Sequence, residues 1–302
     1  MAEKPTWMDR IRSLAQGLRA KPWISRLLLA LSILYILLLL YLSRSEIQNI
    51  DWGSFGARFA ICAGLYYLSM LLQNLNWSLI VDQNTRGLRE NSEIYFNTLL
   101  MKRLPGGFWH WLGRSNMYAE KEKTPANNLV KSNLIEWLSL ILTGLCCYVA
   151  TLTIWGGIAI LVLSAGVILR LGRNPSRSNL QSLPRVFLML GLYLACWLLG
   201  ALIMDILLDG IIAPQTSPFL LSIKTWSLSG SVATFVFFLP NGALIREFTL
   251  TALLTPYYDL PKVVMLALQI RLVFTLSEVV FSLLSLQLIR LSQRLTGRPK
   301  AS

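Results

Sequence analysis

Two short helix-breaking stretches, Leu104-Pro105-Gly106-Gly107 and Leu239-Pro240-Asn241-Gly242, are each set within apolar sequence. Proline removes a backbone donor and glycine accepts backbone angles that other residues resist, so a helix does not run straight through either stretch. At membrane depth the freed backbone groups are tolerated only where protein or a wet cavity satisfies them. Charge follows each break: Arg114 after the first, and Arg246 and Glu247 after the second. We therefore expect two broken hairpins that together build one polar site.

Composition places the chain in a membrane. Of its 302 residues, 54% are hydrophobic and 14% are charged. Several apolar runs approach the roughly 20 residues that a helix needs to cross a bilayer. The predicted fold is an all-α polytopic membrane protein with about six full spans and two broken or re-entrant hairpins, about eight hydrophobic segments in total. No small-residue cleavage site follows Leu27–Leu42, so this segment is expected to stay in place as part of the first span.

The net charge of +13 has two readings. No nucleic-acid motif accompanies it, so nucleic acid is not an expected partner. The positive residues cluster beside the apolar runs, which is the pattern of a topology signal and of contact with anionic lipids. Membrane lipids, anionic ones above all, are therefore the expected partners, beside a homo-oligomer or an envelope-pathway protein as alternatives.

Motifs of common chemistry are missing from the sequence. It has a single histidine, His110, and no Walker A, G-x-S-x-G or H-E-x-x-H motif. The cysteines lie inside apolar segments without metal-ligand spacing, and we expect them to be small core residues: Cys62, Cys146, Cys147 and Cys196. No metal, cofactor or catalytic residue is predicted, and the chain is not expected to be an enzyme.

The apolar segments divide into full spans and hairpin arms. The predicted spans are Ile24–Leu42, Ala57–Val81, Leu129–Ile154, Ile158–Leu171, Val186–Ile212 and Lys262–Arg294. The predicted hairpin arms are Ile94–Leu104 with Phe108–Tyr118, and Phe219–Leu239 with Ala243–Leu254. A polar loop is expected over Asp82–Glu93, and a tight turn at Trp155-Gly156-Gly157.

The order of segments suggests an internal duplication. Aligning Pro105 with Pro240 also places Glu136 on Arg271, each equally far beyond its proline. The predicted units are an amphipathic basic segment at residues 1–23, a first repeat at 24–154, a second at 155–294 and a tail at 295–302. Each repeat crosses the membrane an odd number of times, so the second is inverted. Lys and Arg gather on one side, which predicts that both termini lie in the cytoplasm.

Ionisable residues within the apolar segments are the candidates for a site, because each costs about 2.5–3.5 kcal/mol on insertion scales. The candidate substrate-binding residues are Arg114, Glu136, Arg246, Glu247, Arg271 and Glu278. The arginines suit a phosphate, since their planar fork binds two oxygens at once. The alternative is that these charges pair with one another and fix the hairpins. Tryptophans and tyrosines near the span ends are expected to be interfacial anchors.

At these residues the chain resembles a known family. Leu104-Pro105-Gly106-Gly107 with Arg114 and Glu136 is similar to the first half-motif of the flippase-like membrane domain of lysylphosphatidylglycerol synthase, also called multiple peptide resistance factor. Pro240-Asn241-Gly242 with Arg246, Glu247 and Arg271 is similar to the second. The bulky run Phe108-Trp109-His110-Trp111 and the residue Asn241 depart from the family pattern. The sequence carries no aminoacyl-transferase domain, so the resemblance implies a stand-alone membrane region.

The resemblance implies a protein of a prokaryotic plasma (inner) membrane that moves a lipid between leaflets. The leading hypothesis is a flippase-like transporter of an anionic phospholipid or a lipid-linked sugar, with an Arg/Glu-lined cavity between the hairpins. One alternative is a non-transporting accessory or assembly factor of an envelope or glycolipid pathway. The other is an intramembrane enzyme on lipid phosphates, with Glu136 or Glu247 as a base, which no metal motif supports.

Overall fold

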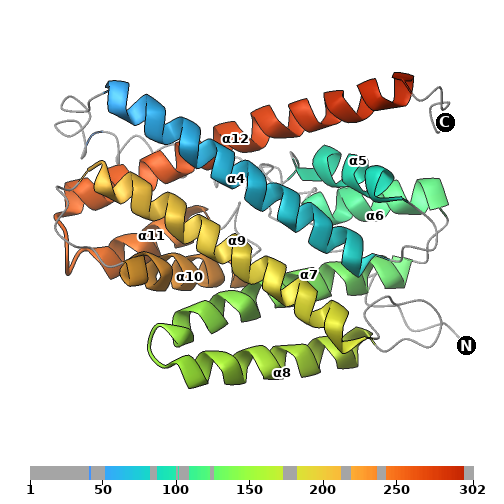
Figure 1. Cartoon of the computed structure of the whole chain (residues 1–302), viewed down its shortest axis with the longest axis horizontal. Coiled ribbons are helices and arrows are strands. Elements are labelled where there is room, and N and C mark those ends of the chain that lie inside the picture. The colour runs from blue at the N-terminus through green and yellow to red at the C-terminus, as the bar shows by residue number, and fades with distance from the viewer. Residues whose placement is uncertain are drawn as a thin grey trace, which may run out of the picture.

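The computed structural model describes residue 41 and residues 52–81, 87–99, 101, 109–122, 126–172, 182–211, 219–236 and 243–295. These ranges contain nine α-helices and no strand. Figure 1 shows the helices, which are α4 (Trp52–Ile80), α5 (Leu88–Leu99), α6 (Trp109–Glu122), α7 (Ala126–Ala150), α8 (Ile154–Gly172), α9 (Leu183–Asp209), α10 (Phe219–Phe235), α11 (Ala243–Leu254) and α12 (Leu260–Leu295). The predicted basic segment, most of the predicted first span, both helix-breaking stretches and residues 296–302 lie outside the described residues.

Five of these helices are long and apolar enough to cross a membrane. The candidate spans are Phe55–Ile80, Asn128–Ala150, Ile154–Gly172, Leu183–Asp209 and Leu260–Ser292. A helix rises 1.5 Å per residue, so even the 19-residue span on α8 extends nearly as far as the roughly 30 Å hydrocarbon core. The described part of the chain is that of a helical, polytopic membrane protein.

The remaining helices are shorter and form two pairs in contact. Helix α5 packs against α6, and α10 packs against α11. With 12 and 14 residues in α5 and α6, and 17 and 12 in α10 and α11, each falls short of the roughly 20 residues of a full crossing. These four helices overlap the predicted hairpin arms, and the helix-breaking stretches between the arms lie outside the described residues.

The long helices α4 and α9 form the centre of the bundle. They pack against each other, and Figure 1 shows their axes nearly parallel across the view, with the chain running in opposite directions along the two helices. The α5–α6 pair lies to one side of them and the α10–α11 pair to the other. Helix α7 packs on α10, while α12 packs on α5, so each hairpin is contacted by a long helix from the other half of the chain.

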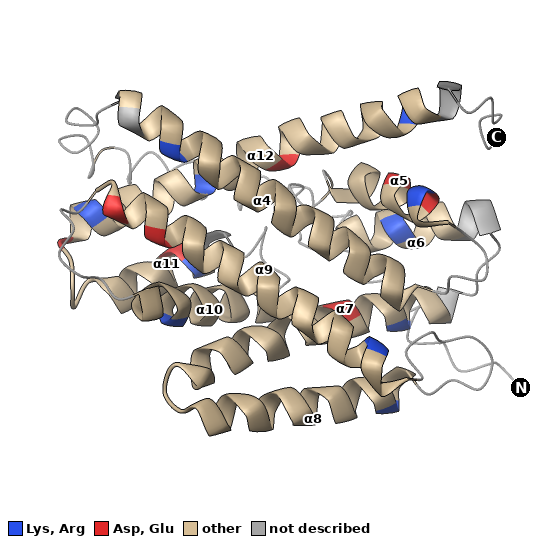
Figure 2. Ribbon diagram, in the orientation of Figure 1, with Lys and Arg blue, Asp and Glu red and all other residues tan. Residues whose placement is uncertain are grey.

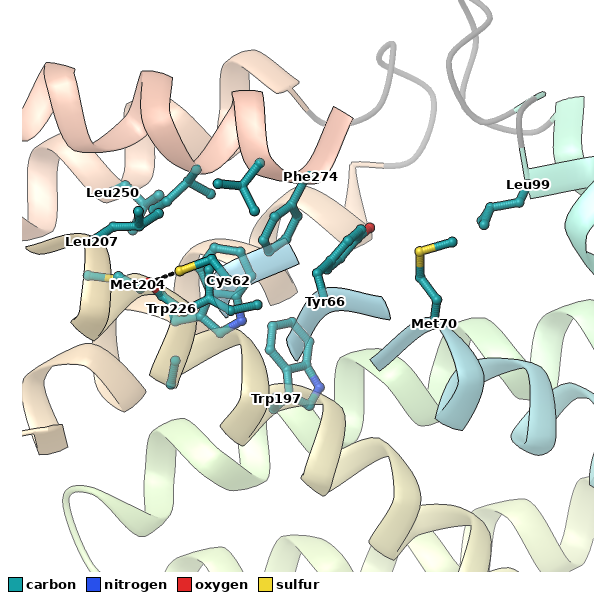
Figure 3. Packing of buried hydrophobic residues seen from close by; sticks show 14 of the residues in the cluster. Cys62, Tyr66, Met70, Leu99, Trp197, Met204, Leu207, Trp226, Leu250 and Phe274 are labelled. Carbon is teal, nitrogen blue, oxygen red and sulfur yellow. Dashed lines mark hydrogen bonds between the residues drawn. The ribbon is translucent and has the colours of Figure 1, made fainter. Parts of the chain in front are cut away.

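Aromatic rings fill the core between α4, α9, α10 and α12 (Figure 3). Tyr66 and Phe274 stack with ring centroids 4.0 Å apart, and Trp226 meets Phe274 edge-on at 5.3 Å. Such pairs contribute about 0.5–1.5 kcal/mol each beyond area burial. Glycines make room for the indoles: a Cβ at Gly200 would overlap Trp226, and one at Gly230 would overlap Trp197. Small residues thus let α9 and α10 approach closely, as is usual between membrane helices.

Most predicted segments are confirmed, with shifted ends. Helix α11 has the predicted bounds, and α4, α7, α8, α9 and α12 cover the predicted spans. Helix α9 begins after the extended residue Ser182, and Pro184 lies in its first turn, where its missing N–H costs nothing. The predicted loop over Asp82–Glu93 is partly wrong, since α5 begins at Leu88. Asn91 is buried there and accepts a hydrogen bond from the Tyr118 hydroxyl at 2.8 Å, a tertiary contact that the local sequence does not reveal.

The predicted turn at Trp155-Gly156-Gly157 is wrong. The chain turns at residues 151–153, and the two glycines belong to the first turns of α8. A Cβ at Gly157 would overlap Ala150, so this glycine allows α8 to approach the end of α7. Glycine here serves close packing of helices rather than a change of chain direction.

Candidate functional site

A cavity of about 270 Å³ lies inside the bundle. Its lining side chains come from α4, α6, α7, α9, α10, α11 and α12, so both hairpins contribute to it. The residues from the spans, such as Tyr66, Tyr193 and Glu278, stand near the middle of their candidate spans rather than at the ends. The cavity therefore opens at the depth where a bilayer is most apolar.

Charges are sparse on the helices, as Figure 2 shows. Lys, Arg, Asp and Glu gather toward the bundle ends and around α5 and α6, and isolated acidic positions interrupt α7 and α12. Three of the six predicted site residues line the cavity, namely Glu136 on α7, Arg246 on α11 and Glu278 on α12. Arg114, Glu247 and Arg271 are not among its lining residues but form ion pairs with one another or with those that are. The six predicted residues thus form two ion-paired groups, Arg114 with Glu136 and Arg246 and Arg271 with Glu247, while Glu278 is held by Tyr66.

Arg114 and Glu136 form the tightest of these pairs. The arginine Nη1 lies 2.6 Å from Glu136 Oε2, and its side chain is 0% exposed while that of the glutamate is 13% exposed. The Arg114 guanidinium also lies 4.4 Å from the Trp77 ring centroid and 4.7 Å from that of Tyr95. Arg114 is thereby neutralised and enclosed between α4, α5 and α7. This agrees with the alternative in which the charge forms an ion pair that fixes the hairpin, rather than binding substrate.

The second pair is looser. Arg271 Nη1 lies 3.8 Å from Glu247 Oε1, and Arg246 Nη2 lies 3.9 Å from the same oxygen. Both distances exceed those of a hydrogen bond. The two arginine side chains keep 25% and 23% of their surface exposed, while the glutamate keeps 3%. These cations therefore retain donor capacity for another anion.

Arg246 is the arginine that faces the cavity. Its guanidinium carbon lies 5.3 Å from the ring centroids of both Trp226 and Phe274. A cation over aromatic faces is stabilised without using its N–H donors, so the planar fork stays available to a phosphate or carboxylate. Arg246 is the best-placed residue for binding an anionic group.

Glu278 is held by a short hydrogen bond. The Tyr66 hydroxyl donates to Glu278 Oε1 at 2.5 Å, joining α4 to α12 beside the cavity. A hydrogen bond to a carboxylate is stronger than one between neutral groups and fixes the direction of the acid. Glu136 and Glu278 thus present oriented carboxylates to the cavity.

Aromatic side chains make up much of the remaining wall. They are Tyr66, Trp111, Trp137, Tyr193, Trp197, Trp226 and Phe274. Two of the indoles are held by their nitrogens: Trp197 Nε1 donates to Leu140 O at 3.1 Å, and Trp137 Nε1 donates to Thr234 O at 2.9 Å. The wall is therefore largely pre-formed, as small-molecule sites usually are.

The sequence analysis expected tryptophan and tyrosine residues near the span ends to be interfacial anchors, and it did not predict that others line a cavity. Tyr66, Tyr193 and Trp197 stand mid-span, where an anchor has no interface to reach. That position along the span is the signal that could have identified them. The predicted burial of all four cysteines is confirmed, and Cys196 also borders the cavity.

The described residues hold no group of three or more His, Cys, Asp or Glu side chains that could bind a metal ion. His110, the sole histidine, lines the cavity beside Trp111, with ring centroids 5.6 Å apart. No family model matches the chain, and no curated protein matches its sequence.

Proposed function

We propose that the protein is a flippase-like transporter, which moves an anionic phospholipid or a lipid-linked sugar between leaflets. The observation that carries the proposal is the placement of Arg246, Glu136 and Glu278 around one cavity at mid-span depth. Charged side chains in such a place are costly, and in membrane proteins they characteristically mark a substrate path. The headgroup enters the cavity while the acyl tails stay in the lipid.

An inverted repeat underlies the proposed mechanism. In this scheme α4 corresponds to α9, α5–α6 to α10–α11, and α7 to α12. The reciprocal packing of α7 on α10 and of α12 on α5 supports it. So does the exchange of charge between the pairs Arg114–Glu136 and Glu247–Arg271, each of which joins the second arm of a hairpin to the span after it. Transporters of this plan bind substrate where their repeats meet, near the midplane.

The two pairs have different roles in the proposed cycle. The tight Arg114–Glu136 pair holds the first hairpin against α7. The loose Glu247–Arg271 pair leaves the second hairpin able to shift against α12 when a phosphate competes for Arg246. A ligand moves such an equilibrium only through a difference in affinity between the two states, and Arg246 supplies that difference.

The resemblance to the flippase-like domain of lysylphosphatidylglycerol synthase supports the same function. We place the protein in a prokaryotic inner membrane, as this resemblance implies, and both termini in the cytoplasm, since Lys and Arg concentrate on one side of the segments. The two repeats, residues 24–154 and 155–294, form the transport unit, which performs no covalent chemistry.

Leaflet transfer in proteoliposomes tests the proposal. Purified protein should accelerate transfer of fluorescent anionic lipids over protein-free vesicles, and Arg246→Ala should reduce that acceleration roughly 10- to 100-fold by removing charge-assisted hydrogen bonds. Arg290→Ala is the matched control, because Arg290 is exposed near the end of α12. Unchanged transfer in both Arg246→Ala and Arg271→Ala would remove the mechanism.

A further inference from the structure

Resting on the proposed function, we infer that the cavity selects a headgroup in which a phosphate carries one uncharged, polyhydroxylated ring, a sugar or a cyclic polyol. The phosphate binds at Arg246 and the ring occupies the aromatic part of the cavity. The inference follows from the distribution of charge, from one buried hydroxyl and from the walls.

Charge places the phosphate at one end. Arg246 is the only arginine or lysine among the described lining residues, while Glu136 and Glu278 line the rest. Two carboxylates repel a second anion but accept hydrogen bonds from hydroxyl groups. The six predicted site residues comprise three arginines and three glutamates, so their formal charges cancel. Without an excess of positive charge they do not favour a polyanion over a headgroup with a single phosphate.

Tyr193 supplies the most direct indication of a ligand. Its side chain is 1% exposed and lines the cavity. Its hydroxyl has no hydrogen-bond partner among the residues that the structure describes. Buried polar groups are nearly always hydrogen-bonded, and an unmet one costs about 1–3 kcal/mol. In the proposed complex a small shift of the Tyr193 side chain allows a ligand hydroxyl in the cavity to hydrogen-bond to this group.

The walls suit a ring. Trp197 and Trp137 are fixed by their indole hydrogen bonds and line the cavity together with polar residues such as Gln73 and Thr234. A sugar ring has the matching surface, because its C–H faces pack on an aromatic ring while its hydroxyls point to the edges. The volume of about 270 Å³ lies just under the roughly 300–1,000 Å³ of drug-sized sites, so it admits one ring rather than an oligosaccharide.

Tryptophan fluorescence of the purified protein tests the selectivity, since four tryptophans line the cavity. The probes are a short-chain alkyl hexosyl phosphodiester, the same alkyl phosphate without the ring, and the alkyl phosphoethanolamine. Free hexose 1-phosphate and inorganic phosphate separate a lipid headgroup from a soluble source. We expect the hexosyl phosphodiester to bind about tenfold more tightly than the alkyl phosphate, and free hexose 1-phosphate to bind more weakly than its alkyl ester.

Tyr193→Phe isolates the ring contact. Loss of one hydrogen bond should weaken the hexosyl phosphodiester roughly 3- to 10-fold and leave the alkyl phosphate unchanged. The apparent Tm should not fall, because the variant removes an unsatisfied hydroxyl. The matched control is Tyr257→Phe in the exposed turn before α12. Arg246→Gln should weaken both alkyl compounds.

The inference is overturned if the hexosyl and ringless compounds bind equally, if phosphoethanolamine binds best, or if Tyr193→Phe leaves hexosyl binding intact. Tight binding of hexose 1-phosphate without preference for its alkyl ester would overturn the lipid-headgroup assignment. Selectivity is measured on the unmodified protein, so a poorly folded variant does not block the test. If the protein transfers anionic lipids between leaflets but shows no preference for a ring, this inference is wrong and the transporter proposal stands. If the protein binds ring-bearing headgroups selectively but transfers no lipid, the transporter proposal is wrong and the binding site stands.

Discussion

Glu247 on α11 and Arg271 on α12 lie 3.8 Å apart, in the same relation as Arg114 on α6 and Glu136 on α7 but with the charges exchanged. The first-half pair is short and its arginine fully buried, whereas the second-half pair lies beyond hydrogen-bond distance and its arginine is one-quarter exposed. Substitution in the Arg114–Glu136 pair should therefore lower the stability of the protein. Substitution in the Glu247–Arg271 pair should instead slow transport.

Substitution within the tight pair should destabilise the protein. Glu136→Leu leaves the Arg114 guanidinium buried without its carboxylate, which costs about 3–5 kcal/mol. We expect a clear fall in apparent Tm in detergent, with partial recovery in the double variant Arg114→Met, Glu136→Leu. Lys262→Ala, which breaks the exposed Lys262–Asp259 pair, should cost under about 1 kcal/mol. An unchanged Tm in Glu136→Leu would contradict the structural role of this pair.

The two second-half arginines should separate binding from movement. Arg246 lines the cavity and Arg271 does not, so Arg246→Ala should weaken binding of an alkyl phosphate roughly 10- to 100-fold. Arg271→Ala should keep that affinity within a factor of about two and slow leaflet transfer, because it alters the contact between α11 and α12 rather than the cavity. Equal losses of affinity in both variants would argue against this division.

Glycine positions on one helix provide a matched steric test. A side chain at Gly200 would overlap Trp226, whereas Gly191 on the same helix faces open space. Gly200→Val should therefore destabilise by about 1–3 kcal/mol through overpacking. Gly191→Ala should be neutral or slightly stabilising, since alanine favours helix over glycine. Apparent Tm and ligand-induced fluorescence check both variants, and a Gly200→Val protein as stable as the unmodified one would contradict the packing.

The proposed topology predicts the sides from which single cysteines react. Arg185→Cys, at the start of α9, should be labelled by an impermeant thiol reagent from the cytoplasmic side. Asp259→Cys, just before α12, should be labelled from the outside. The native cysteines are buried, so background labelling should be low. Labelling of both positions from one side would remove the inverted arrangement.

Apolar length and helix-breaking residues were sufficient to predict most of the fold. The spans carried by α4, α7, α8, α9 and α12 follow from runs of apolar residues, and the bounds of α11 follow from the helix-breaking residues on either side of it. The start of α5 and the turn between α7 and α8 were not predictable in this way. Asn91 is buried in α5 because Tyr118, far away in the sequence, donates a hydrogen bond to it. Gly157 lies in α8, where its missing side chain allows close approach to Ala150 on α7. Neither contact can be predicted from the local sequence.

The charged part of the site was predictable because buried charge stands out in an apolar chain. The sequence identified Arg114, Glu136 and Arg246, but not which of them pairs and which faces the cavity. Tyr193 was not predicted, because a tyrosine within a span is common. It stands out only in the structure, where its hydroxyl is buried and has no hydrogen-bond partner among the described residues. That distinction depends on three-dimensional packing.

Photo-crosslinking of a lipid headgroup most directly tests the claim that the cavity receives one. The probe is an anionic lipid with a diazirine in its headgroup, applied to the protein in vesicles and mapped by mass spectrometry. The account predicts labelling of cavity segments that contain Tyr193, Trp197 and Glu136, and a strong reduction of this labelling by Arg246→Ala. Labelling confined to exposed outer positions such as Leu163 on α8, with no change in Arg246→Ala, would contradict it.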